Sequence, residues 1–118
     1  MENQILDVLH LQKSALLRLS TSSASDRISK LRKIESYLMQ HKEELCDALY
    51  ADFKKPASEV LIAEMLGVKR EINHTIKHLK SWMKPQSVST PLMLLGTKGL
   101  VQYEAKGLCL IISPWNYP

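Results

Sequence analysis

The residues best suited to chemistry lie in the stretch 113–118, Ser-Pro-Trp-Asn-Tyr-Pro. This stretch follows an unbroken apolar run at 108–112, and open α/β sheets bind their ligands at the carboxyl ends of such strands. Prolines before and after Asn116 restrict the backbone, so its side-chain amide is held in place. A fixed amide donor suits stabilisation of a developing oxyanion. A structural turn with a packed Trp115 explains the same residues equally well, and the residues alone leave both interpretations open.

A pair of histidines offers a second kind of chemistry, metal binding. His74 and His78 are four residues apart, so a helix would place both imidazoles on one face. Glu71 and His74 also have the Glu-x-x-His spacing of carboxylate-bridged metal bundles, in which the motif occurs twice. This sequence lacks the second copy and the remaining ligands. We therefore interpret the histidines as polar residues on a helix surface and predict no metal site.

The two cysteines, Cys46 and Cys109, each stand alone in an apolar-patterned segment. They lack the spacing of a disulfide framework, which indicates free thiols in a reducing compartment. Cys109 lies between two leucines, with no neighbouring cation or helix N-terminus to activate a nucleophile. Both cysteines are therefore predicted to be small buried core residues rather than catalytic groups.

Three amphipathic helices are expected ahead of the tail. Apolar residues recur at helical spacing over residues 4–19 and again over 26–52, where His41 fills a gap in the apolar stripe. The second helix must end before Pro56, because the residue preceding a proline is disfavoured in helical conformation.

The third helix is predicted over residues 58–84, with Ser58 as its N-cap and Pro85 as its end. Ile62 and Ile72 belong to its apolar stripe. Acidic residues lie toward its start and basic residues toward its end, an order that complements the helix dipole.

The composition changes after the third helix. Residues 86–91 read as an extended linker, and residues 92–95 and 100–104 as two strands around the glycine-bearing turn 96–99. The apolar run 108–112 is predicted to be a strand buried on both faces, as in parallel sheets. Parallel neighbours return only through crossovers of about a dozen residues. None follows here, so the chain is expected to be the front end of a larger α/β protein.

Composition and charge bound the function. A length of 118 residues with 45% hydrophobic content fits one ordinary domain. The net charge of +4, from 16 basic and 12 acidic residues, is spread along the chain, so nucleic-acid binding ranks last among the functions considered. Glycine-rich phosphate loops are absent from the sequence. The start is not a basic leader, and no apolar run has membrane-spanning length. We expect a soluble, cytoplasmic protein with no nucleic-acid partner.

Residues 110–118, Leu-Ile-Ile-Ser-Pro-Trp-Asn-Tyr-Pro, resemble the strand-and-turn motif of the aldehyde dehydrogenase superfamily. Residues 104–108 resemble that family's lead-in, with Ala105 where the family usually has proline. Residues 76–85, together with Glu71, resemble its third helix. Agreement is closest to the class 3, fatty-aldehyde-like branch.

The resemblance implies an α/β fold cut short, with the first strand of an incomplete Rossmann-like parallel sheet. Residues 1–85 would be the helical segment of the cofactor-binding domain and 86–106 a linker and oligomerisation hairpin. Residues 107–118 would be the first strand and turn of that domain. The family oxidises aldehydes to carboxylic acids with NAD or NADP, through a thioester on a cysteine.

The resemblance also assigns roles to residues. Asn116 matches the oxyanion-hole asparagine, and Ile112, Ser113, Pro114 and Trp115 match the lining of the cofactor cleft. The nucleophilic cysteine and the glutamate base have no counterpart in this sequence, so the chain alone is expected to be inactive. The hairpin implies a homo-oligomer, most simply a dimer. The alternative is a non-catalytic helical interaction module, in which the long helices bind a partner and the tail is structural.

Overall fold

The computed structural model describes the backbone of residues 2–114, 116 and 117, and the side chains from Gln4 onward. The chain divides into two compact units. The first unit comprises residues 1–24 and 80–112, and the second comprises residues 25–79 and 113–118.

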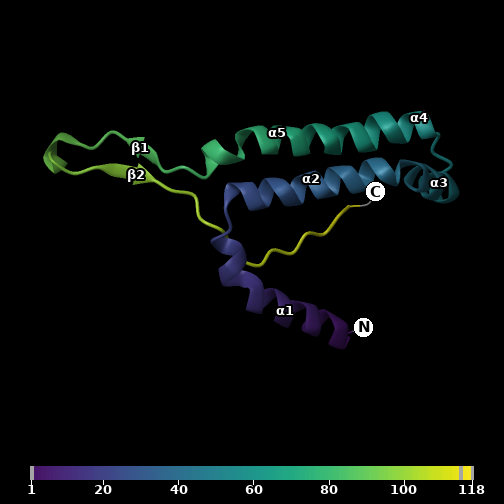
Figure 1. Ribbon diagram of the computed structural model, residues 1–118, viewed down its shortest axis with the longest axis horizontal. Coiled ribbons are helices and arrows are strands. Elements are labelled where there is room, and N and C mark those ends of the chain that lie inside the picture. Colours follow the sequence, from purple (N-terminus) through teal and green to yellow (C-terminus); the bar gives the residue numbers. More distant parts are fainter. Residues whose placement is uncertain (1, 115, 118) are drawn as a thin grey trace. The chain divides into compact units, whose positions relative to one another are not determined.

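The first unit contains helix α1 (Glu2–Ser20) and a small antiparallel hairpin of β1 (Gln86–Val88) and β2 (Gly99–Val101). In the hairpin Gln86 lies opposite Val101, and Val88 lies opposite Gly99. A 3-10 turn, η2 (Leu92–Leu94), lies between the strands, at the far end of the arm in Figure 1. The helix predicted over 4–19 is confirmed.

The second unit is built from helices. Its elements are α2 (Ala24–Gln40), α3 (Lys42–Phe53), α4 (Ala57–Glu59), the π-helical turn η1 (Val60–Met65) and α5 (Leu66–Trp82). Helices α2 and α5 run side by side in opposite directions (Figure 1). The Asn73 side-chain amide of α5 donates a hydrogen bond of 3.1 Å to the Glu35 carboxylate of α2. The unit is therefore a helical hairpin with a corner at α3 and α4.

The prediction of a single helix over residues 26–52 was wrong, because the helix breaks at His41. The backbone of His41 leaves helical geometry at φ −102° and ψ 21°. Its N–H still donates to the Tyr37 carbonyl at 3.0 Å, and its Nδ1 lies 3.1 Å from Glu44 Oε1 in the first turn of α3. His41 fills a gap in the apolar stripe, but no glycine or proline lies near it, so the sequence gives no strong signal of the break.

The third predicted helix is present, but its start and its interior differ. Pro56, extended at φ −68° and ψ 146°, occupies the N-cap position, and its carbonyl accepts from the Glu59 N–H at 2.9 Å. Ser58 lies inside the first turn and is not the N-cap. The π-helical turn then inserts a wider turn and changes which residues face inward. Ile62, predicted to belong to the apolar stripe, is 70% exposed, whereas Met65 and Ile72 of the same stripe are buried.

The predicted hairpin exists with different strands. Residues 92–95 were expected to pair, but they form the 3-10 turn and its exit, and β1 comes from the predicted linker. Gly96 takes the positive φ of 93° that the turn needs. Gly99 allows a close approach of the two strands. An added Cβ at this position would lie 2.9 Å from a methyl group of Val88 across the ladder.

The strand predicted over residues 108–112 is absent from the structure. No residue in this segment is in a strand, and Leu110, Ile111 and Ile112 are 86%, 88% and 82% exposed. Cys109 is exposed as well, contrary to the prediction of burial. A strand requires hydrogen bonds from a neighbouring strand, and within the described residues the only ladder joins β1 to β2. The parallel sheet is therefore not formed here.

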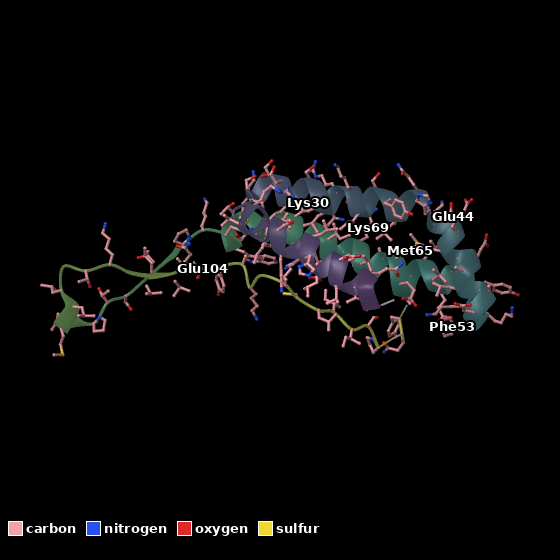
Figure 2. All side chains as sticks on the ribbon, turned by 90° about the horizontal axis from the view of Figure 1, so that it is seen from below. Lys30, Glu44, Phe53, Met65, Lys69 and Glu104 are labelled. Carbon is pink, nitrogen blue, oxygen red and sulfur yellow. The ribbon has the colours of Figure 1, made fainter. Side chains whose placement is uncertain are left out.

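The core of the described residues is small. Among the described hydrophobic side chains, only Val60, Met65 and Ile72 are buried, and all three lie in the second unit. Met65 lies in η1, which contacts α3, and Figure 2 labels its position within the helices of the second unit. The packing of these few side chains holds the helical hairpin together.

Truncating a core isoleucine tests this assignment. Ile72 is 8% exposed, so Ile72→Ala removes buried methyl groups and should lower the free energy of unfolding by about 2–4 kcal/mol. Ile62→Ala is the matched control at an exposed site and should change it by less than about 0.5 kcal/mol. Urea unfolding followed by circular dichroism measures both, and equal effects would contradict the assigned core.

Candidate functional site

The tail that carries the candidate chemistry lies on the surface. Ser113, Pro114 and Asn116 are exposed, and the side-chain amide of Asn116 has no hydrogen bond to any other described residue. Trp115, predicted to line a cofactor cleft, lies outside the described residues. Ile112, predicted beside it, is exposed and belongs to the first unit. The structure therefore presents Ser113, Pro114 and Asn116 together on the second unit.

One contact fixes the tail to the helices of the same unit. The ammonium of Lys55 lies 5.3 Å from the centroid of the Tyr117 ring, within the range of a cation–π interaction. Tyr117 is the residue after Asn116, so this contact anchors the backbone beside the candidate amide. Lys55 is not singled out by the sequence analysis.

Lys55 is itself held by acidic residues. Its ammonium donates a hydrogen bond to the Glu64 carboxylate and lies 3.9 Å from the Glu59 carboxylate. The side chains of Lys55 and Glu64 are 15% and 11% exposed, so the pair is largely shielded from water. A shielded pair defines position more strictly than a solvent-exposed pair does.

The fold explains how these residues meet. After α3, Lys54 adopts a left-handed conformation at φ 57°, and its N–H donates to the Tyr50 carbonyl at 2.9 Å. The chain therefore turns at once, and Pro56 starts the next helix. Glu64 then lies in the π-helical turn, nine residues beyond Lys55. A separation of nine residues fits no local sequence motif, so the Lys55–Glu64 pair could be recognised only from the folded structure.

The environment of Lys55 stabilises its charged form. The hydrogen bond to Glu64 raises the pKa of Lys55 above 10.5, opposed by burial and helped by the negative charges of Glu64 and Glu59. Lys55 is therefore a cation under ordinary conditions. As a cation it can hold an aromatic ring.

The other candidates do not form a site. The His78 Nδ1 lies 2.8 Å from the His74 carbonyl oxygen, and the two rings lie 4.3 Å apart. The described residues contain no group of three or more histidine, cysteine, aspartate or glutamate side chains arranged for a metal. Cys46 is half-buried on α3, and Cys109 is exposed. Among residues 2–114, 116 and 117, no helix combines the length and apolar character needed to cross a membrane.

The raised pKa of Lys55 predicts a pH dependence of stability. The folded chain binds this proton more tightly than the unfolded chain, so the stabilisation is complete below the ordinary lysine pKa of 10.5. It is lost as the pH rises through the higher folded-state pKa. The difference in Tm between the wild type and Lys55→Met should be constant from about pH 7 to 9 and shrink above 10.5. Lys77→Met, at an exposed position on α5, is the control, and a pH-independent difference for Lys55→Met would contradict the assignment.

Comparison with known proteins identifies the family of the chain. The model of the aldehyde dehydrogenase family matches residues 2–118. AldX of Bacillus subtilis (strain 168) is 38% identical, and the alignment covers 100% of this chain and 27% of AldX. The probable coniferyl aldehyde dehydrogenase of Caulobacter vibrioides is 37% identical, covering 95% and 24%. Aldehyde dehydrogenase family 3 member B2 of Mus musculus is 36% identical, covering 93% and 23%.

The chain therefore spans about a quarter of the length of these curated relatives. Several of the similar proteins are family 3 members, in agreement with the branch that the sequence resembles. The match covers the helices, the hairpin and the tail. This chain belongs to the aldehyde dehydrogenase family.

Proposed function

We propose that this chain forms the N-terminal part of an NAD(P)-dependent aldehyde dehydrogenase that oxidises aldehydes to carboxylic acids. The observation that carries the proposal is the Ser-Pro-Trp-Asn-Tyr-Pro tail at 113–118, with an exposed Asn116, in a chain of this family. The alignment with about a quarter of each relative's length supports a longer enzyme. Its remaining catalytic groups would come from outside these 118 residues.

The role of Asn116 follows from its chemistry. When a cysteine thiolate attacks an aldehyde, a C–S bond forms and the carbonyl oxygen takes the electron pair as an oxyanion. The two N–H bonds of the Asn116 amide can donate to that oxygen. A donor fixed before the charge develops stabilises the transition state more than the ground state. The exposed amide is free of competing hydrogen bonds to the other described residues.

The residues ahead of Asn116 fit one wall of a nicotinamide cofactor cleft. Ile112 and Pro114 present exposed apolar surface, and Ser113 adds a hydroxyl between them. Apolar walls with a few polar groups are typical of cofactor sites. Bound NAD or NADP would accept the hydride from the thiohemiacetal carbon, leaving a thioester for a water molecule to hydrolyse. Trp115 is proposed to share this wall, although the structure does not describe it.

The hairpin is proposed to join two copies of the enzyme. Its 3-10 turn exposes consecutive apolar side chains, with Met93 97% exposed. Exposed apolar surface of this kind suits a protein interface. We further propose that the enzyme is cytoplasmic, because both cysteines are free thiols.

Removing the proposed oxyanion donor tests the function. In the complete enzyme, Asn116→Ala should lower kcat by about 10²–10³-fold, the usual cost of losing one such donor. Asn73→Ala, which removes an amide on the helical surface, is the matched control and should leave kcat unchanged. Steady-state kinetics with NAD or NADP measures both. An Asn116→Ala enzyme with wild-type kcat would refute the assignment.

The 118-residue chain by itself should not oxidise aldehydes. Neither Cys46 nor Cys109 matches the family's nucleophile, and the described residues hold no partner base for either thiol. Purified chain mixed with aldehyde and NAD or NADP should therefore give no increase in reduced cofactor absorbance. The complete enzyme is the positive control, and aldehyde-dependent reduction by the chain alone would contradict the proposal.

A further inference from the structure

We propose that Lys55 is a positioning residue for Asn116: fixed by Glu64, it holds the Tyr117 ring and thereby sets the place of the neighbouring amide. The inference rests on the proposed role of Asn116 as the oxyanion donor. It adds a residue from the corner between α3 and α4, more than half the chain away from the tail in sequence.

The first step is the rigidity of Lys55. A lysine on the surface samples many rotamers, and holding one costs side-chain entropy. Here the Lys55 side chain is only 15% exposed and is tied to Glu64, which is 11% exposed. Glu64 belongs to the π-helical turn beside the buried Val60 and Met65. The position of the Lys55 ammonium is therefore set by the packed part of the second unit.

The second step is the contact with the tail. The Lys55 ammonium lies 5.3 Å from the Tyr117 ring centroid. Among the residues that the structure describes, no other cationic or aromatic group contacts this ring. Tyr117 is 64% exposed, so apolar burial contributes little to its placement. The interaction with Lys55 is thus the main described force on the side chain next to Asn116.

The third step compares this contact with a similar one. Lys54 lies 5.1 Å from the Tyr50 ring, but these residues are one turn apart at the end of α3 and join nothing else. Lys55 and Tyr117 instead join the helical corner to the tail. Only the second contact can transmit the position of the packed helices to the candidate amide.

Kinetics of the complete enzyme test the inference. Losing a cation–π contact of ordinary strength should lower kcat in Lys55→Met about two- to fivefold, with the KM for aldehyde changed less than about twofold. An interaction that matters only in the transition state gives this split. Lys55→Arg keeps a cation over the ring and should restore kcat. Lys77→Met, an exposed lysine on α5, should match the wild type.

A double-mutant cycle separates positioning from general stability. If Lys55 acts through Asn116, Lys55→Met should change kcat less than about 1.5-fold in an Asn116→Ala background. A full two- to fivefold loss in that background would overturn the inference. Tyr117→Leu removes the ring while leaving the Lys55–Glu64 pair intact, and it should show the same dependence on Asn116. This variant keeps the test decisive if Lys55→Met does not fold.

The outcomes distinguish the two proposals. A slow Asn116→Ala enzyme with wild-type kcat in both Lys55→Met and Tyr117→Leu would overturn the positioning role alone. Wild-type kcat in Asn116→Ala would overturn the proposed function, and the positioning role with it. Loss of kcat in Lys55→Met that is rescued by Lys55→Arg and vanishes in the Asn116→Ala background would support both.

Discussion

The ion pair between Lys55 and Glu64 links three segments of the second unit that are distant in sequence. It joins the turn after α3 to the π-helical segment, and through Tyr117 it reaches the tail. A charged pair shielded from water is favourable only when its geometry is good, because both ions lose hydration. The turn at Lys54 and the start of the helix at Pro56 supply that geometry through the backbone. The corner and the pair therefore require each other.

Many apolar side chains of the chain are exposed and would be stabilised by contact with further protein surface. Three hydrophobic side chains are buried among the described residues, whereas Leu110, Ile111 and Ile112 are almost fully exposed. Burial of apolar surface contributes about 25 cal/mol per Å², so such segments gain most when another surface covers them. In the enzyme proposed above, that surface would come from the rest of the chain or from a second copy. In that enzyme, the apolar run 108–112 would pack against this additional surface.

Features set by neighbours along the chain could be predicted from the sequence, and features set by distant residues could not. The ends of the second and third helices follow from Pro56 and Pro85, because proline restricts the residue before it. The break at His41 and the π-helical turn have no such local signal. The tail at 113–118 stands out in the sequence by its composition, whereas the lysine that contacts it becomes visible only when α3 and η1 meet. The strand expected over 108–112 failed because pairing needs partners that no local pattern supplies.

A donor amide in an oxyanion site has to be in place before the negative charge forms, since reorganisation during the reaction would consume the stabilisation it provides. Proline on either side of Asn116 limits the backbone but leaves the direction of the whole tail undetermined. The direction of the tail must be set by a contact with the packed structure. Among the described residues, no ladder to a strand supplies that contact. The cation over the Tyr117 ring does provide one, and it does so without using either N–H of the amide. In the proposed enzyme, local restriction by proline and a distant anchor at Lys55 would be complementary, and together they would leave the amide both fixed and available.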